Sequence, residues 1–248
     1  MKFKKLSILM PMYNEELYAA ANILETDKYF KNLKINYEII VMDDGSKDMT
    51  FKKANKMKKH HIHIYRIKKN QGKGHALKWA FKKSKGDLIM FLDGDLDIHP
   101  RQFEVLFKIM QKENADVVIG SKRHPESVLH YPVKRKIVSM VYFLIVKLLF
   151  GLPLRDTQTG IKLFKRKVLD STFDKLLIKG YAFDLELLVL AHHYGYKISE
   201  APVVVDYKGK YGHITIKTIF NILWDTLAVF YRLKILKYYD KLDNRVER

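Results

Sequence analysis

The chain has 248 residues, of which 48% are hydrophobic and 29% charged, so a folded globular core is expected rather than a disordered chain. It contains no cysteine, which excludes disulfide bonds and cysteine-ligated zinc. The formal net charge of +19 favours anionic partners: nucleic acid, nucleotide phosphates or an anionic membrane surface. The N-terminal apolar run is soon broken by Pro11 and Asn14, and it is too short for a signal peptide.

The first half of the chain alternates strand-like and helix-like segments. Asn14 is the expected N-cap of the first helix. This alternation predicts an α/β fold, with a mostly parallel sheet flanked by helices on both faces. In such sheets ligands bind beyond the carboxyl ends of the strands. Strands are expected at 6–10, 37–42, 62–67, 87–92 and 116–120, helices at 14–24, 49–59, 72–83 and 101–113, and polar strand ends at 11–15, 43–46, 93–95 and 121–123.

The segment 87–97 runs from an apolar strand into three carboxylates at alternate positions, Asp93, Asp95 and Asp97. If strand geometry continues through Asp97, its period of two brings the three side chains to one side. Gly94 leaves room for a close approach to the backbone. Three hard oxygen donors in a basic protein indicate Mg²⁺ or Mn²⁺, with phosphate as a further ligand. The alternative is a solvated acidic turn after a buried strand.

Other strand ends carry residues suited to a nucleotide. The glycine-flanked Lys73 can present charge and backbone N–H groups to phosphate, although the segment is not a P-loop and can equally be a tight turn. Asp43 and Asp44 can accept hydrogen bonds from a base or ribose, or they can cap the following helix. Two further side chains can line the base or ribose, or be ordinary loop residues: Tyr13 and Glu15.

The second half of the chain contains two apolar helical segments. The first, 137–150, follows a basic stretch and is apolar nearly all round, but it is too short to span a bilayer. The second, 214–236, has helical apolar spacing and basic ends. Each segment is expected either in the core or in a membrane interface.

The polar strand ends, taken in order, resemble motifs of the family 2 glycosyltransferases, which have the GT-A fold. Two later runs, 156–164 (DTQTGIKLF) and 181–188 (YAFDLELL), look like the polyprenyl-phosphate hexose synthases. They are most similar to dolichyl-phosphate glucosyltransferases, with the mannosyltransferases as near relatives, and the resemblance covers about residues 6–236. The strand-end motifs that carry the resemblance are Pro11-Met12-Tyr13-Asn14-Glu15, Asp43-Asp44-Gly45-Ser46, Asn70-Gln71-Gly72-Lys73-Gly74 and Asp93-Gly94-Asp95.

The resemblance implies a GT-A (Rossmann-like) domain over residues 1–211. Its nucleotide-sugar half is expected at about 1–124 and its acceptor half, with the apolar helix 137–150, at about 125–211. A C-terminal amphipathic helix and basic tail follow at 212–248.

The resemblance also implies residue roles. Asp93 and Asp95 would hold Mg²⁺ or Mn²⁺ against the nucleotide diphosphate. Asp97 replaces a Gln or Ser of the mannosyltransferase relatives, so a direct bond from Asp97 to the metal is an open question. Asp43 would contact the base. The rest of the nucleotide-sugar set is Pro11, Tyr13, Glu15, Asp44, Lys73 and Gly94.

On the acceptor side, Arg123, Arg135 and Ser139 match positions that grip the lipid phosphate, and membrane-surface charge is the alternative for Arg135. Four residues would lie near the reacting groups or, alternatively, only order the loop above them: Asp156 and Gln158 facing the donor sugar, and Asp184 and Glu186 near the acceptor side.

The implied reaction is transfer of glucose, with inversion, from UDP-glucose to a polyprenyl (dolichyl-type) phosphate at the cytoplasmic membrane face. GDP-mannose is the alternative donor, and a sugar hydroxyl is the third-ranked acceptor. A nucleic-acid partner is not expected, because no base-stacking motif accompanies the charge. The intact Asp93-Gly94-Asp95 motif disfavours a scaffold with an inactive transferase domain. A homo-oligomer or a membrane-protein partner remains open.

Overall fold

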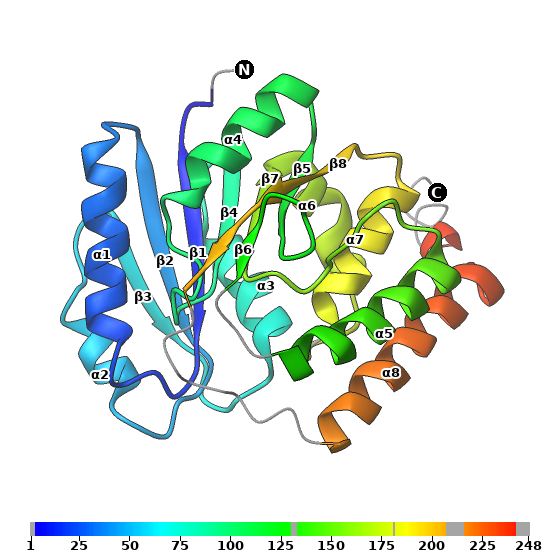
Figure 1. The fold of residues 1–248 in the computed structure, drawn as a ribbon. Coiled ribbons are helices and arrows are strands. Elements are labelled where there is room, and N and C mark those ends of the chain that lie inside the picture. Colours follow the sequence, from blue (N-terminus) through cyan, green and yellow to red (C-terminus); the bar gives the residue numbers. More distant parts are fainter. Residues whose placement is uncertain (1–2, 130–132, 181, 207–215, 242–248) are drawn as a thin grey trace.

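The computed structural model describes residues 3–129, 133–180, 182–206 and 216–241, without the side chains of 133–139 and 216–219. These residues form a seven-stranded sheet with helices on both faces (Figure 1). The sheet order is β3-β2-β1-β4-β7-β5-β8, and β6 pairs with β9 in a small second sheet. The strands are β1 (Leu6–Met12), β2 (Tyr37–Asp43), β3 (Ile62–Arg66), β4 (Leu88–Leu92), β5 (Val117–Ser121), β6 (Val128–Leu129), β7 (Ile161–Lys165), β8 (Ile198–Pro202) and β9 (Val204–Val205).

Every pairing in the large sheet is parallel except those of β7, which runs antiparallel to both β4 and β5. The predicted mostly parallel sheet is therefore confirmed, and its first five strands lie within two residues of their predicted bounds. Because β7 is reversed, Ile161 at its start pairs with Leu92 at the end of β4. The loop before β7 thus reaches the same edge of the sheet as the carboxyl ends of the parallel strands.

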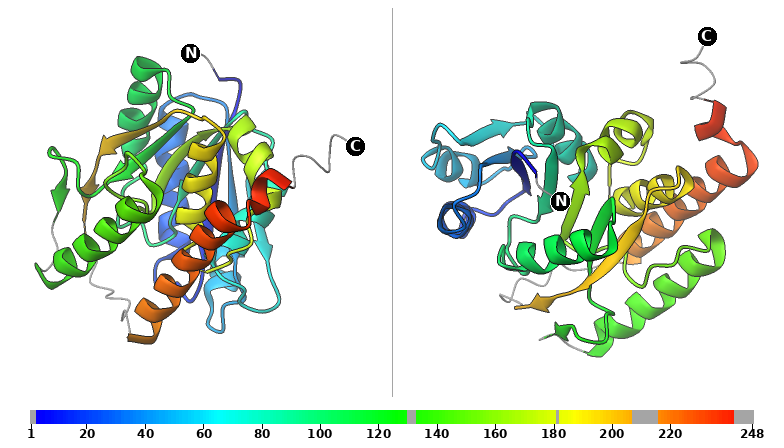
Figure 2. Two further views of the ribbon diagram at one scale, coloured as in Figure 1. Left: turned by 90° about the vertical axis from the view of Figure 1, so that its right-hand side faces the viewer. Right: turned by 90° about the horizontal axis from the view of Figure 1, so that it is seen from above.

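Two layers of helices bury the two faces of the sheet. Successive residues of a strand point to opposite faces, so Ile8 packs with α1 and α4, whereas Leu9 packs with α3 and α7. Helices α5 and α8 lie side by side, and α8 contacts α7 (Figure 2). The helices are α1 (Ala19–Asn32), α2 (Thr50–Asn55), α3 (Lys73–Lys83), α4 (Gln102–Glu113), α5 (Val133–Phe150), α6 (Arg166–Thr172), η1 (Phe173–Lys175), α7 (Phe183–His193), α8 (Ile216–Phe230) and the π-helical turn η2 (Tyr231–Ile235).

The first helix differs from its prediction. It begins at Ala19, and Asn14 has a left-handed φ of 54°, so the prediction that Asn14 is its N-cap is wrong. Asn14 instead joins two loops: its backbone N–H donates to Ser46 Oγ, and its Oδ1 accepts from the backbone N–H of Lys47. A side chain engaged across the sheet edge in this way is unavailable to cap a helix.

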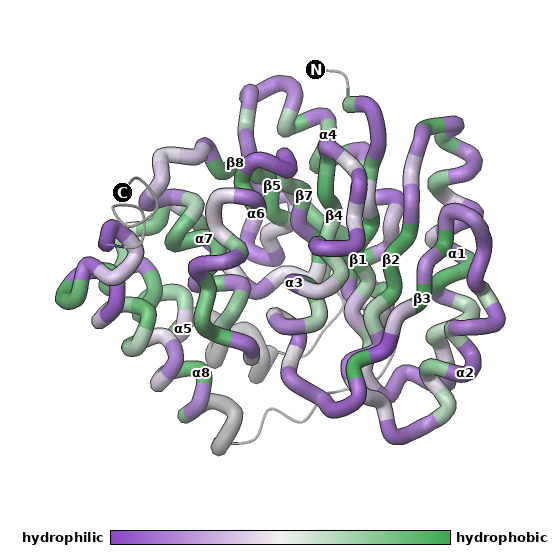
Figure 3. Tube along the Cα trace, turned by 180° about the vertical axis from the view of Figure 1, so that it is seen from behind, coloured by the Kyte–Doolittle hydropathy of each residue, from purple (hydrophilic) through white to green (hydrophobic). Residues whose placement is uncertain are grey.

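Helices α5 and α8 each present apolar side chains both to the core and to the outside. The inner face of α5 buries Val146 and Phe150, and that of α8 buries Val229. Other large apolar side chains of this region are exposed. In Figure 3, green hydrophobic stretches occur along both helices among more polar ones. No helix in the described ranges is both long and apolar enough to cross a membrane. The exposed set is Met140, Val141, Leu144, Leu148, Phe220, Trp224, Leu227, Tyr231 and Ile235, called here the apolar stripe.

A buried carboxylate ties α1 to the edge of the sheet and gives a test of its stability. Burial raises the pKa of Asp27, but hydrogen bonds from Lys59, Tyr37 and His61 outweigh it and lower the pKa to about 2. Because the folded pKa lies below the unfolded one, this contribution is complete above about pH 4 and is lost as the pH falls towards about 2.

We expect Asp27→Asn to lower the free energy of unfolding by about 2 kcal/mol at pH 7. The measurement is urea unfolding of both proteins at pH 7 and pH 3, and the difference between them is expected to be smaller at pH 3. A difference that does not change with pH would show that the charge of Asp27 contributes nothing.

Candidate active site

The polar strand ends predicted from the sequence meet along one edge of the sheet. The loops after β1 and β2 are joined by a hydrogen bond from the N–H of Asp44 to the carbonyl of Met12. The loops after β4 and before β7 are joined by one from the N–H of Asp93 to the carbonyl of Gly160. Residues from these four segments therefore lie along one edge of the sheet.

The acidic segment turns sharply instead of continuing as a strand. Strand β4 ends at Leu92, and Leu96 has a left-handed φ of 52°. The prediction that strand geometry persists through Asp97 is therefore wrong, because the chain turns at Gly94. Gly94 is required by packing, since a Cβ there would lie 2.6 Å from Met12 Cγ. In the described part of the chain, no three acidic or histidine side chains converge as a ready-made metal site.

The carboxylates of this turn repel one another. Burial raises the pKa of Asp95, and the charges of Asp93, Asp97 and Glu15 raise it further. A bound cation would relieve this repulsion and stabilise the ionised carboxylates. Mg²⁺ commonly uses one or two carboxylates and completes its shell with water and substrate phosphate. The residues of the turn therefore fit a divalent cation, and the assignment of Asp93 and Asp95 as its ligands stays a prediction.

A chain of alternating charges runs from this turn into the core. Lys73 Nζ lies 2.7 Å from Asp93 Oδ1 and 3.5 Å from Asp184 Oδ2. On the far side of Asp184, Lys162 Nζ lies 2.8 Å from Oδ1. Burial lowers the pKa of Lys73, but the carboxylates of Asp184 and Asp93 outweigh it and raise the pKa. Lys73 therefore stays protonated and positively charged beside the acidic turn.

Two of the residues that build this arrangement were not singled out from the sequence. Lys162 lies on β7 between two apolar residues and is 1% exposed, and a charged residue inside an apolar strand was the signal that could have identified it. Asn22, on α1, donates from Nδ2 to the carbonyl of Gly94 at 2.7 Å and so supports the acidic turn. No local pattern indicated Asn22, because its partner is 72 residues away.

The predicted nucleotide residues lie at the ends of β1 and β2. Asp43 is fully buried, burial raises its pKa, and Arg66 Nε lies 3.1 Å from its Oδ2. Asp44 accepts hydrogen bonds from the backbone N–H groups of Gln71 and Gly72, and so holds the loop that carries Lys73. The contacts of these residues with a base or ribose stay predictions. The other predicted nucleotide residues at this edge are Pro11, Tyr13, which is 40% exposed, and Glu15.

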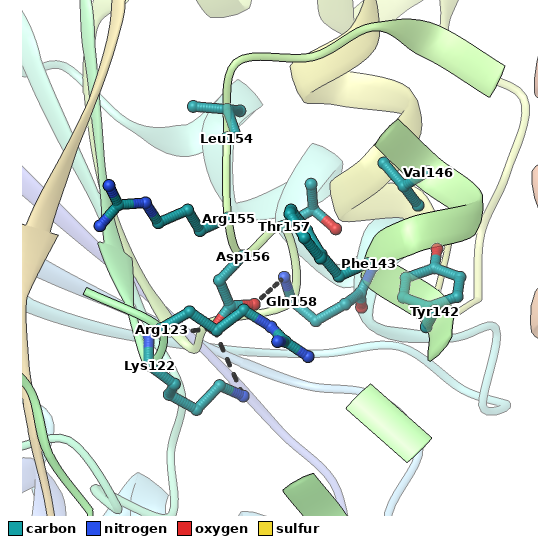
Figure 4. A pocket seen from close by; sticks show the side chains of 10 residues that line it. All are labelled: Lys122, Arg123, Tyr142, Phe143, Val146, Leu154, Arg155, Asp156, Thr157 and Gln158. Atoms are coloured by element: carbon teal, nitrogen blue, oxygen red, sulfur yellow. Dashed lines mark hydrogen bonds and ion pairs between the residues drawn. The ribbon is translucent and has the colours of Figure 1, made fainter. Parts of the chain in front are cut away.

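A pocket lined by cationic and apolar side chains, called here the cationic pocket, includes Asp156 and Gln158 of the loop before β7 (Figure 4). The same loop reaches the acidic turn, because the carbonyl of Gly160 accepts a hydrogen bond from the N–H of Asp93. Asp156 orders the floor of this pocket by accepting hydrogen bonds from the backbone N–H groups of Lys122 and Gln158. The guanidinium of Arg123 lies over the ring of Phe143, 5.1 Å from its centre. The pocket is lined by Lys122, Arg123, Tyr142, Phe143, Val146, Leu154, Arg155, Asp156, Thr157 and Gln158.

The remaining predicted acceptor residues are only partly placed. Arg135 and Ser139 belong to α5, but their side chains lie outside the described residues. Glu186 is fully buried away from the pocket and accepts hydrogen bonds from Arg232, Tyr239 and two backbone N–H groups. Its position supports the alternative that Glu186 orders the surrounding loop and does not contact an acceptor.

Gly160 lets the loop before β7 approach the acidic turn, which can be tested directly. A Cβ at this position would lie 2.5 Å from Asp93 Oδ2. We expect Gly160→Ala to displace Asp93 and lower turnover about 100-fold, since small displacements of reacting groups have effects of this size. The measurements are the steady-state rate of the glucose transfer expected from the sequence and the midpoint of thermal unfolding.

Gly195→Ala is the control for Gly160→Ala. Gly195 has a φ of 76° with nothing near its Cβ position, so alanine there strains the backbone without touching the site. It is expected to lower stability by about 1 kcal/mol and leave turnover unchanged. If both variants lose activity in proportion to stability, Gly160 has no special role.

Comparison with known proteins identifies the family. The model for "Glycosyl transferase family 2" matches residues 7–173. The dolichyl-phosphate beta-glucosyltransferase of Dictyostelium discoideum is 32% identical over 213 residues, or 80% of this chain and 65% of that protein. The one from Homo sapiens is 32% identical over 216 residues, or 81% of this chain and 67% of that protein. The chain thus spans about two thirds of the length of these relatives.

A solved structure supports the fold. Glucosyl-3-phosphoglycerate synthase from Mycobacterium tuberculosis, in complex with Mn²⁺, uridine diphosphate and glucosyl-3-phosphoglycerate, superposes with a TM-score of 0.70 at 19% identity. The match covers 92% of this chain and 79% of that one. The expected GT-A architecture and the expected resemblance are both confirmed. This chain belongs to glycosyl transferase family 2.

Proposed function

We propose that the protein transfers glucose from UDP-glucose to a polyprenyl phosphate at the cytoplasmic face of a membrane, with inversion of the anomeric carbon. The observation that carries this proposal is a combination of two subsites that the loop 156–160 connects. One is the acidic turn with Lys73, which suits a metal-bound diphosphate, and the other is the cationic pocket with apolar walls, which suits a lipid phosphate. The names of the relatives support the same donor sugar and acceptor.

The cationic pocket would position the acceptor. Lys122 and Arg123 would attract its phosphate, and Phe143 and Val146 would contact the first apolar units of its chain. A phosphate oxygen already carries negative charge near neutral pH, so it needs no strong general base. Positioning this oxygen in line with the anomeric carbon is the main task of these residues.

In the reaction, a bond forms between the acceptor phosphate oxygen and the anomeric carbon, and the bond from that carbon to the diphosphate oxygen breaks on the opposite side. Lys73 would stabilise the charge that develops on the leaving diphosphate. A divalent cation bound at Asp93 and Asp95 would neutralise part of the same charge. Asp156 and Gln158 lie in the loop between the two subsites and would face the donor sugar.

A donor screen tests the proposal. Purified protein is incubated with polyprenyl phosphate and either labelled UDP-glucose or labelled GDP-mannose, with Mg²⁺ or Mn²⁺ and with EDTA. We expect lipid-linked glucose only with the metal present. Formation of lipid-linked mannose would show that the donor is GDP-mannose and not UDP-glucose. Full activity in EDTA would overturn the assignment of a metal to the acidic turn.

The predicted role of Arg135 is tested in the same assay. Arg135→Ala is expected to raise the KM for polyprenyl phosphate at least about tenfold, because charge-assisted contacts to phosphate are strong, and to leave the KM for the donor unchanged. Equal changes in both would remove Arg135 from the acceptor site.

The apolar stripe on α5, α8 and η2 supports a position at the membrane surface. Leu148 is 86% exposed and Trp224 is 66% exposed, and large apolar side chains gathered on one face mark an interaction surface. Amphipathic helices in a strongly basic protein suit an anionic interface, in which the apolar side chains enter the acyl boundary. The acceptor phosphate would then reach the neighbouring pocket while its chain stays in the bilayer.

We expect the double change Leu148→Ser and Trp224→Ser to weaken binding to anionic phospholipid vesicles at least about tenfold, because two large apolar side chains no longer leave water. The measurement is vesicle co-sedimentation. Leu17→Ser is the matched control, since Leu17 is 67% exposed but lies outside the stripe, before α1. Equal effects of the two changes would contradict the assignment of this surface.

A further inference from the structure

Lys73 is shared by two carboxylates from distant parts of the chain. Asp93 belongs to the turn after β4, and Asp184 lies in the first turn of α7. The ammonium of Lys73 is closer to Asp93, at 2.7 Å, than to Asp184, at 3.5 Å. The side chains of Lys73 and Asp93 are 28% and 34% exposed, whereas that of Asp184 is 5% exposed. One partner of Lys73 therefore faces the site, and the other faces the core.

Asp184 is fixed from the core side by Lys162. The Nζ of Lys162 contacts Asp184 Oδ1 at 2.8 Å and donates to the carbonyl of Thr159 at 2.5 Å. Replacing a buried ion pair with apolar residues is often neutral or stabilising. A contribution to stability therefore does not explain why the Asp184–Lys162 pair is buried here. What the pair does provide is a carboxylate held rigidly within reach of Lys73.

Lys73 and a metal ion are rival cations for the same carboxylate. A cation bound at Asp93 Oδ1 would meet the ammonium that now lies 2.7 Å from that oxygen, and like charges at contact distance repel strongly at a partly buried site. Lys73 therefore has to leave Asp93 when a metal binds there. Asp184 is the partner towards which it can turn.

We propose that Lys73 moves between Asp93 and Asp184, and that Asp184, held by Lys162, is the partner to which Lys73 withdraws when a divalent metal occupies Asp93 before a diphosphate is bound. This inference rests on the proposed function, because it assumes that a metal and a nucleotide diphosphate bind at the acidic turn. It adds a positioning role for Asp184 and Lys162.

The arrangement makes metal and nucleotide binding cooperative. A metal that binds alone has to displace Lys73 from Asp93. A diphosphate attracts Lys73 to its own oxygens and so frees Asp93 for the metal. By linkage, the metal then raises the affinity for the nucleotide by the same factor.

The test is a titration of the full chain with Mn²⁺, with and without UDP, in which the electron paramagnetic resonance signal reports free Mn²⁺. Lys73→Met removes the rival cation and leaves Asp184 paired with Lys162. We expect it to tighten the binding of Mn²⁺ alone at least about fivefold and to reduce the enhancement by UDP, because the diphosphate still ligates the metal but no longer has a rival cation to draw away.

The double variant Asp184→Asn with Lys162→Met removes the withdrawal position without leaving a buried charge unpaired. Lys73 then has Asp93 as its partner, so Mn²⁺ alone is expected to bind at least about fivefold more weakly. Lys73→Arg keeps the cation and is expected to retain the enhancement by UDP. The unfolding midpoint of each variant is measured, so that affinities are compared between folded proteins.

Opposite shifts of Mn²⁺ affinity in Lys73→Met and in the double variant support the proposal. Shifts in the same direction, or no shift in either, would overturn it, because a merely structural role gives the same sign in both variants. Absence of Mn²⁺ binding to the unmodified chain with UDP would overturn it as well. Because the measurement is of binding, failure of transfer to polyprenyl phosphate would overturn the proposed function and leave this result intact.

Discussion

Replacing Asp95 with Asn is expected to lower kcat/KM for hexose transfer about 1,000-fold, the size of effect seen when a main electrostatic contact to developing charge is removed. Asn keeps the volume of the side chain but removes the charge that would hold the metal against the diphosphate. The measurement is transfer from labelled UDP-glucose at saturating Mg²⁺ or Mn²⁺.

The same change is not expected to destabilise the fold. Burial and the charges of Asp93 and Asp97 raise the pKa of Asp95, so its ionised form is disfavoured in the absence of a cation. Asp95→Asn removes this repulsion, and its unfolding midpoint is expected to equal or exceed that of the unmodified chain. Functional sites commonly trade stability for activity in this way.

Two further variants make the test of Asp95 specific. Asp170→Asn on α6, where the carboxylate is 57% exposed, is expected to change neither activity nor stability. Asp97→Asn addresses the question that the sequence left open, since a loss as large as that of Asp95→Asn would indicate a direct metal ligand. An Asp95→Asn protein that keeps more than about a tenth of the activity contradicts the proposed site.

The second large effect is expected on stability. Glu186 is fully buried and joins three segments of the chain. Its Oε2 accepts hydrogen bonds from the backbone N–H groups of Leu177 and Ile178. Its Oε1 accepts hydrogen bonds from the side chains of Arg232 and Tyr239. Glu186→Ala leaves the Arg232 guanidinium, only 17% exposed, without its buried carboxylate. We expect the free energy of unfolding to fall by about 3–5 kcal/mol, the typical cost of breaking a buried ion pair.

This loss is expected to appear first as local opening of the C-terminal segment. Urea unfolding measures the total change, and limited proteolysis measures the release of the residues after α8. Glu126→Ala is the control, because Glu126 is exposed and its change is expected to stay within about 0.5 kcal/mol. Unchanged protease resistance in Glu186→Ala would show that this network does not hold the C-terminal segment in place.

The sequence by itself determined the sheet and its polar edge. Buried parallel strands give continuous apolar runs, and the run at Ile39–Val41 is of this kind, so its place in β2 was predictable. Because parallel strands end at a common edge, the ends at Asp43 and Asp93 could be assigned to one site without coordinates. Helix starts were less predictable, since Asn14 has the residue type of an N-cap but its side chain bonds to another loop.

Only the tertiary structure decided how the site is completed. The antiparallel insertion of β7 between β4 and β5 brings Gly160 against Asp93, and a pairing between segments about 70 residues apart leaves no local pattern. The same reversal places Lys162 beneath the site, where it holds Asp184 within reach of Lys73. The alternation of side chains along a strand determines which residues face the core. Which charged side chains meet at the ends of the strands depends on which strands become neighbours in the sheet.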